Sequence, residues 1–340
     1  MTRSDASEPP GAGLADRFGR VATDLRVSLT DRCNLRCTYC MPAEGLDWLP
    51  NPSLLTDDEI VRLIAVAVGR LGVTDVRFTG GEPLLRRGLT EIVRAVAALP
   101  DRPRMMLTTN GIGLARLAAP LAEAGLDRVN VSLDTTDPAR FKAITRRDRH
   151  ADVLAGLAAS ADAGLVPVKM NAVLLRGVND DEAVPLLKFA LERGYELRFI
   201  EQMPLDAGHT WRREEMITGA EILAALRSAF TLTPDSHARG GAPAETWFVD
   251  GGPARVGVIA SVSSPFCGAC DRTRLTADGT VRSCLFSQKE TDLRGALRAG
   301  AGDEELADLW RKAMWAKPAG HGIDDPKFLQ PARPMSAIGG

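Results

Sequence analysis

Short apolar runs alternate with longer amphipathic segments between about residues 24 and 203. The apolar runs are typical of buried strands, and they lie at residues 25–30, 73–78, 104–110, 128–134, 166–175 and 196–203. The amphipathic segments predict helices at residues 56–72, 88–99, 114–125, 151–164 and 181–194. Thr56 and Glu59 form a capping box at the start of the first helix, and Gly72 can end it.

This alternation predicts a parallel sheet, because parallel strands need long crossover connections and helices supply them. Right-handed crossovers wind such a series into a barrel or into an open sheet. About six β-α units are too few for an eight-fold barrel. We therefore expect an α/β fold with a partial (β/α)6 TIM-like barrel, and an open doubly wound sheet is the structural alternative.

The pattern changes after about residue 216, where a helix at 219–229 is followed by shorter β-like segments. The stretch 272–286 is typical of a hairpin whose turn is Asp278-Gly279. Further helices are predicted at 291–299 and 303–315, and the last residues, PMSAIGG, are expected to be a flexible tail. The expected parts are a disordered tail (1–13), the barrel (14–240) and a C-terminal α+β region (241–340).

The composition is that of an ordinary globular chain, with 340 residues of which 45% are hydrophobic and 25% charged. The net charge of −2 gives no reason to expect a nucleic acid or an anionic membrane as partner. Apolar runs such as LIAVAV at 63–68 are far shorter than the roughly 18 residues that a membrane span needs. The N-terminus has no apolar signal core, so we expect a cytoplasmic protein with reduced thiols.

The six cysteines form two triplets, which are Cys33, Cys37, Cys40 and Cys267, Cys270, Cys284. In a reducing compartment they indicate metal or redox chemistry rather than disulfides. A 4Fe–4S cluster is usually held by four thiolates, so three would leave one iron open to a small molecule. Zinc is the alternative, but a structural zinc ion needs a fourth Cys or His ligand. No histidine lies near the first triplet, whereas the C-x2-C start of the second also suits a zinc ribbon.

The first triplet, with Tyr39 before its last cysteine, resembles the signature of the radical S-adenosylmethionine superfamily, and TGGEP at 79–83 resembles its second motif. The resemblance implies a partial (β/α)6 barrel. It also implies that the open iron chelates the methionyl group of S-adenosylmethionine and that the reduced cluster cleaves this cofactor to a 5′-deoxyadenosyl radical.

The second triplet lies in FCGACDRTRLTADGTVRSCLF (266–286), and this stretch with the final Gly339-Gly340 resembles the GTP 3′,8-cyclase family of molybdenum cofactor biosynthesis. The likeness runs from about residue 14 to residue 340. It implies two 4Fe–4S clusters, the second of which contacts the guanine of GTP, and the product 3′,8-cyclo-7,8-dihydro-GTP. It further implies a homodimer, pyranopterin monophosphate synthase as functional partner, and a Gly-Gly tail that inserts toward the active site. No stretch identifies the electron donor.

The resemblance also implies which residues bind the ligands. The metal ligands are the six cysteines, and no side chain is assigned as catalytic because the clusters and the cofactor radical carry the chemistry. The positions that match contacts to S-adenosylmethionine are Tyr39, Gly81, Ser132 and Met203. The positions that match contacts to GTP are Arg26, Arg77, Thr108, Lys169, Arg272, Thr273 and Arg274. Asp271 stands where the family usually has Asn, and its carboxylate would repel a triphosphate unless an arginine pairs with it.

The strand pattern supports these positions independently. The first triplet, Gly81, Thr108, Ser132, Lys169 and Met203 fall within or just after the C-terminal parts of six successive predicted strands. Active sites of α/β barrels form at that face. Two other functions stay open at this point: another radical enzyme, such as a peptide maturase with an auxiliary cluster, and a zinc-stabilised binding or regulatory protein.

Overall fold

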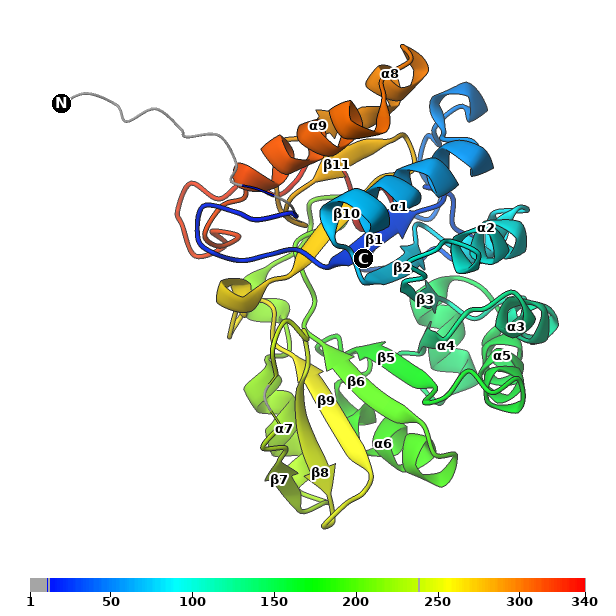
Figure 1. The fold of residues 1–340 in the computed structure, drawn as a ribbon. Coiled ribbons are helices and arrows are strands. Elements are labelled where there is room, and N and C mark those ends of the chain that lie inside the picture. Colours follow the sequence, from blue (N-terminus) through cyan, green and yellow to red (C-terminus); the bar gives the residue numbers. More distant parts are fainter. Residues whose placement is uncertain (1–10, 12, 238, 340) are drawn as a thin grey trace.

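The computed structural model of the chain describes residue 11, residues 13–237 and residues 239–339. The predicted disordered tail at 1–13 therefore lies, apart from residues 11 and 13, outside the described residues. Figure 1 shows a strongly curved sheet with helices along its outer surface.

Twelve strands of the described residues form one sheet in the order β12-β11-β10-β1-β2-β3-β4-β5-β6-β9-β8-β7. The strands predicted in the barrel are β1 (Asp24–Ser28), β2 (Asp75–Thr79), β3 (Arg104–Thr109), β4 (Arg128–Ser132), β5 (Lys169–Val173) and β6 (Glu196–Ile200). The later strands are β7 (Leu232–Pro234), β8 (Glu245–Val249), β9 (Arg255–Ile259), β10 (Arg272–Leu275), β11 (Thr280–Arg282) and β12 (Thr291–Asp292).

Helices connect the strands and cover the outer side of the sheet (Figure 1). Those between the barrel strands are α1 (Asp57–Leu71), α2 (Leu89–Ala97), α3 (Leu114–Glu123), α4 (Pro138–Thr145), α5 (His150–Asp162) and α6 (Ala183–Glu192). The later ones are α7 (Gly219–Arg227), α8 (Leu293–Arg298), α9 (Asp303–Trp315) and α10 (Met335–Ile338). Short 3-10 helices lie at Asn51–Ser53, Pro83–Leu85, Asp180–Glu182, Arg213–Glu215 and Cys267–Ala269.

The predicted partial barrel is confirmed, because β1 to β6 pair in order and every neighbouring pair is parallel. Strands from the C-terminal part of the chain lengthen the wall at both ends. Strand β9 runs parallel to β6, and β10 runs parallel to β1 with Arg26 opposite Arg274. The hairpin predicted at 272–286 is β10 and β11, which are antiparallel. The C-terminal segment therefore completes the barrel wall.

Residues at the ends of two helices explain why these helices form where they do. Thr56 and Glu59 make both hydrogen bonds of the predicted capping box, and Gly72 adopts the left-handed conformation that ends α1. Helix α4 was not predicted from the apolar pattern, although Asp137 caps it by accepting from the backbone N–H of Arg140 and Pro138 occupies its first turn.

The predicted flexible tail at PMSAIGG is wrong for its described residues. Residues 335–338 form the short helix α10, and Ile338 is completely buried against Leu205 and Phe286. Burial of such a side chain stabilises the segment by roughly 1.5–3 kcal/mol. The sequence signal for the burial of this segment was Ile338, an apolar residue with small neighbours.

Alternation along the strands decides which side chains enter the barrel. In β1, Leu25 and Val27 belong to the hydrophobic core, whereas Arg26 between them lines an internal cavity. The inner face of the sheet is therefore where polar groups gather.

No helix of the described residues has the length and the apolar composition needed to cross a lipid bilayer.

Candidate functional site

A cavity of about 380 Å³ opens inside the barrel, and all six cysteines line it. All six are free thiols that are partly buried. The structure thus brings together two triplets that lie more than 200 residues apart in the sequence. Other predicted site residues also line this cavity, namely Arg26, Tyr39, Arg77, Gly81, Thr108, Ser132, Met203, Arg272 and Arg274.

The loop that carries the first triplet follows β1 and rests on the TGGEP turn after β2. The backbone N–H of Gly81 donates to Thr30 O at 2.8 Å, and that of Glu82 donates to Arg32 O at 2.7 Å. A Cβ atom at Gly81 would lie well under 3.0 Å from the backbone oxygens of Asp31 and Arg32. The glycine therefore permits a backbone contact that places Cys33.

Glu82 has a structural role at this turn. Its carboxylate accepts from Thr109 Oγ1 and from the backbone N–H groups of Asn110 and Leu84. Burial raises its pKa to about 7, although these hydrogen bonds oppose the rise. The carboxylate thereby fixes the end of β3 beside the first triplet, where Asn110 also donates to Asn34 at 2.7 Å.

Tyr39 and the end of β4 meet beside the same triplet. The Tyr39 hydroxyl donates to Asp134 Oδ2 at 2.8 Å, and burial raises the pKa of Asp134 to about 6. Burial also raises the pKa of the Cys40 thiol to about 12 and that of Cys37 well above its usual range. Bound iron would be needed to keep these two cysteines as thiolates, since coordination deprotonates a thiol.

The second triplet lies at the junction between β9 and β10 and just after β11. Cys267 and Cys270 occupy the loop before β10, where Arg272 stacks over Phe266 at 4.9 Å from the ring centre. Burial alone would raise the pKa of the Cys270 thiol, but the positive charges of Arg272 and Lys317 lower it to about 7. The surroundings of Cys270 in the second triplet are thus positively charged.

The residues present fit iron–sulfur clusters. Each triplet supplies three thiols and faces the cavity, which leaves room for a further ligand at each. His321 also lines the cavity, where it interacts with Cys267, while its Nδ1 accepts from the backbone N–H of Ile323 and its Nε2 lies 3.0 Å from Ser261 O. A structural zinc ion would need four Cys or His ligands, whereas each triplet supplies three cysteines.

Arginines from different strands meet deeper in the barrel. Arg26, Arg77 and Arg274 occupy matching register positions on β1, β2 and β10. The Nε groups of Arg26 and Arg77 are buried without a hydrogen-bond partner. Arg198 on β6 lines the same cavity. This end of the cavity therefore holds several buried positive charges and unused donors.

The pKa values of these arginines are lowered by burial and by their closeness to one another. Burial first, and then repulsion from neighbouring arginines, lowers the pKa of Arg77 to about 9, that of Arg274 to about 9 and that of Arg198 to about 10. Buried charges of one sign are costly unless an anion compensates them. A polyanionic ligand would provide that compensation and would satisfy the free N–H groups.

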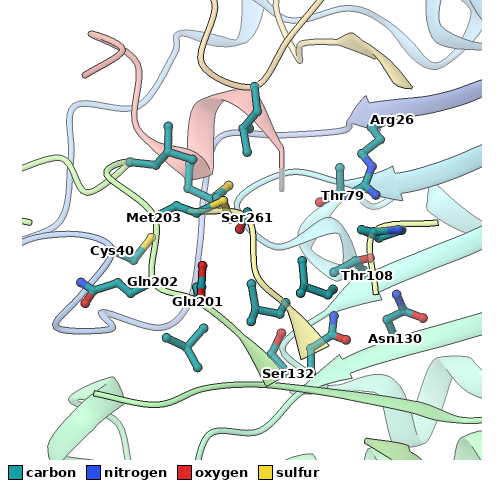
Figure 2. Close-up of a pocket in the computed structure, with 18 of the residues that line it drawn as sticks. Arg26, Cys40, Thr79, Thr108, Asn130, Ser132, Glu201, Gln202, Met203 and Ser261 are labelled. Carbon is teal, nitrogen blue, oxygen red and sulfur yellow. The ribbon is translucent and has the colours of Figure 1, made fainter. Parts of the chain in front are cut away.

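Figure 2 shows how ten labelled residues are distributed around the cavity. Cys40 and Met203 lie at one end, and Arg26 and Thr108 lie at the other, with Ser132 between them. Met203 packs near Leu205 and Phe286 in an apolar cluster that also includes Cys284 of the second triplet.

Two predicted site residues do not line the cavity. Thr273 is fully buried on the opposite face of β10, where its Oγ1 accepts from Trp310 Nε1 at 2.9 Å. Because Arg272 and Arg274 point inward, alternation turns the residue between them outward. The side chain of Thr273 therefore faces away from the cavity, and a contact of this residue with GTP stays a prediction.

Lys169 was expected at the C-terminal part of its strand, and that placement is wrong because β5 begins at Lys169. The apolar residues 166–168 resembled strand but precede it. Lys169 shares the inner face with Asn171, one layer deeper, and its Nζ lies 2.5 Å from Glu196 Oε2. Burial and the nearby Arg198 lower the pKa of Lys169 to about 8.

Asp271, the departure from the usual Asn, does not face the arginines. Its carboxylate packs against Gly241, and it forms no ion pair within 4.0 Å with any described residue. Its backbone oxygen instead accepts from Thr23 and Asp24 at the start of β1. Among the described residues neither Arg272 nor Arg274 forms an ion pair with this carboxylate, although its charge acts on Arg272, and Asp271 does not line the cavity.

The C-terminal segment reaches the arginine end of the cavity. Arg274 Nη1 donates to the backbone oxygen of Gly339, and a Cβ at Gly339 would clash with Ser28. Arg333 anchors the segment through a bidentate pair with Asp278 at 2.8 and 2.7 Å. Gly340 lies outside the described residues.

Several cavity residues were missed by the sequence analysis. Asn130, Asn171 and Arg198 line it from β4, β5 and β6. In the amide orientation that satisfies both sides, Asn130 accepts from Arg77 Nη1 at 2.9 Å. Their polar side chains within otherwise apolar strands were the signal, because a polar residue at an inward position needs a partner.

Comparisons with known proteins agree with this geometry. Residues 27–190 match the family described as "Radical SAM superfamily", and residues 195–323 match "Molybdenum Cofactor Synthesis C". A protein named "GTP 3',8-cyclase" from Streptomyces coelicolor is 68% identical over 100% of both chains. "GTP 3',8-cyclase 2" from Mycobacterium tuberculosis is 65% identical over 98% of this chain and 93% of its own.

A solved structure titled "Native anSMEcpe with bound AdoMet" is similar in fold, with a TM-score of 0.55 and 16% identity over 88% of this chain and 82% of the other. The similarity supports the partial barrel, and the relatives of high identity define the family. The chain therefore belongs to the GTP 3′,8-cyclase family of radical S-adenosylmethionine enzymes.

Proposed function

We propose that this chain converts GTP into 3′,8-cyclo-7,8-dihydro-GTP with a radical derived from S-adenosylmethionine, which is the first step of molybdenum cofactor biosynthesis. The observation that carries the proposal is a single cavity lined by both cysteine triplets and by buried arginines. The high identity to curated cyclases over the whole chain supports the same reaction.

The first triplet would hold one 4Fe–4S cluster, and Tyr39, Gly81, Ser132 and Met203 would surround the cofactor bound to it. When bound there by Cys33, Cys37 and Cys40, the cluster would supply the electron that makes S-adenosylmethionine a source of radical chemistry at the GTP ribose. The residues of the chain position the two molecules and exclude water. The apolar wall around Met203 and Leu205 serves that second purpose.

The second triplet would hold another cluster against the guanine base. The triphosphate would then lie toward Arg26, Arg77, Arg198 and Arg274, a group of inward-facing positive charges beside which Asp24 and Glu196 are the acidic neighbours. Lys169, which pairs with Glu196 one layer deeper, is proposed as a further GTP contact. Thr108 lines the cavity between these groups and is proposed as a GTP contact.

The remaining features of the proposal rest on the family resemblance. They are a homodimer, a cytoplasmic location, delivery of the product to pyranopterin monophosphate synthase, and a functional boundary near residue 240. Light scattering of the purified protein tests the homodimer.

The direct test is anaerobic incubation of the reconstituted enzyme with GTP, S-adenosylmethionine and dithionite. We expect about eight irons per chain, since each triplet would hold a four-iron cluster. We also expect 5′-deoxyadenosine and the cyclised nucleotide in equal amounts. A peptide maturase would leave GTP unchanged, and a zinc protein would be colourless with no iron.

Replacing Arg274 by methionine is expected to weaken GTP binding by about two orders of magnitude. Removal of one partner from a buried charge pair costs about 3 kcal/mol, and 1.4 kcal/mol corresponds to about tenfold. Equilibrium dialysis of labelled GTP under anaerobic conditions measures the change. Thr273→Val is the matched control on the same strand, because its side chain faces Trp310 and should leave GTP affinity unchanged. Equal losses in both variants would contradict the assignment of the arginine.

A further inference from the structure

Lys317 is a buried lysine next to the second cysteine triplet. Only 2% of its surface is exposed. Its Nζ lies 3.3 Å from Cys270 Sγ, 3.1 Å from Cys270 O and 2.9 Å from Arg272 O. These three acceptors match the three N–H donors of an ammonium group.

No carboxylate of the described residues lies within ion-pair distance of this ammonium. Arg20 nearby is different, because its guanidinium lies 2.5 Å from Asp16 Oδ2. An unpaired buried charge is strongly unfavourable unless an anion compensates it. The acceptors around Lys317 are two backbone carbonyls and the sulfur of Cys270, so this sulfur is the acceptor that a bound cluster would make anionic.

The chain holds Lys317 firmly in this place. Helix α9 ends at Trp315, and the backbone N–H of Lys317 donates to Met314 O at 2.9 Å. The next two residues are fixed by Arg20, which donates to Pro318 O at 2.6 Å and to Ala319 O at 2.8 Å. Arg20 also donates to Cys267 O at 2.8 Å, so one side chain joins this segment to the second triplet.

We propose that Lys317 is a positioning residue of the second cluster, which orients Cys270 and lends a fixed positive charge to its sulfur. This inference rests on the proposed function only in assuming that the second triplet holds a cluster. Reduction adds negative charge to a cluster, and a nearby positive charge and an N–H···S bond favour the reduced form. Lys317 therefore makes this cluster easier to reduce.

The test is an EPR-monitored redox titration of the reconstituted enzyme with both clusters present. S-Adenosylmethionine alters the signal of the cluster that binds it, which separates the two signals. In Lys317→Gln the amide can still donate to the backbone oxygens but carries no charge, so the midpoint potential of the second cluster should become more negative. Lys317→Arg keeps the charge and should stay close to the wild type.

Lys312→Gln is the matched control, because this lysine lies in the last turn of helix α9, just before Lys317, but is exposed, and solvent screens its charge. It should leave both potentials unchanged. If Lys317→Gln keeps about eight irons and its second potential equals that of the wild type, the proposal is wrong.

Loss of the second cluster is also informative. If Lys317→Gln retains about four irons while Lys317→Arg retains about eight, the charge is needed to hold the cluster and the proposal stands. If both variants lose it, packing rather than charge is required and the proposal fails. A wild-type enzyme that binds only about four irons would instead contradict the two-cluster function itself.

Discussion

Replacing Cys267 by serine is expected to abolish cyclisation of GTP while S-adenosylmethionine is still bound and cleaved. A serine hydroxyl is a poor iron ligand, so the second cluster should be lost or misplaced. The first triplet is held by TGGEP, Asn110 and Asp134, none of which belongs to the loop around Cys267. Cleavage of S-adenosylmethionine at the first triplet should therefore continue in this variant.

Three measurements separate the two clusters in this variant. Iron should fall from about eight to about four per chain. Formation of 5′-deoxyadenosine with dithionite should continue, and the cyclised nucleotide should be undetectable. Cys37→Ser is the matched comparison, because it should remove cofactor cleavage and cyclisation together. Full cyclase activity of Cys267→Ser would overturn the assignment of the second triplet.

Replacing Gly81 by alanine should remove the first cluster and with it all activity. The new methyl group would overlap the backbone oxygens of Asp31 and Arg32, and these atoms cannot move without moving Cys33. Overpacking of this kind costs about 1–3 kcal/mol or displaces the backbone. We expect about four irons per chain, which belong to the second triplet, and no cleavage of S-adenosylmethionine.

Gly69→Ala provides the control for this substitution. Gly69 lies in helix α1, and a Cβ there would meet no atom within 4 Å. Alanine in a helix is favoured over glycine by about 0.5–1 kcal/mol, so this variant should keep both clusters and melt slightly higher. If Gly81→Ala retains cofactor cleavage at the wild-type rate, the contact between the two loops is not what positions the cluster.

The barrel was predictable because each short, mainly apolar strand is followed by an amphipathic helix. The spacing of β1 to β6 follows directly from that pattern. Helix α4 escaped because it buries few side chains, among them Phe141 and Ile144, and its best signal was the Asp137-Pro138 start. The pairing of β9 and β10 with the ends of the barrel is a long-range contact that local patterns do not contain.

The candidate site was predictable in part. Spacing alone identified both cysteine triplets, and the structure brings them to one cavity. The family resemblance assigned Arg272, Thr273 and Arg274 alike to GTP contacts. Alternation along a strand already implied that the side chain of Thr273 faces outward. The contacts of Lys317 and Arg20 could not be predicted, since each joins segments that only the folded chain brings together.

The pairing of β10 with β1 also matters during synthesis of the chain. Until the ribosome has made β10, the first strand of the barrel has an unpaired edge, and such edges template aggregation. A nascent chain stopped after β9 is consequently an aggregation hazard rather than a smaller barrel. Slow growth at low temperature or an added chaperone should raise the soluble yield of this protein, because both reduce aggregation through the unpaired edge of β1.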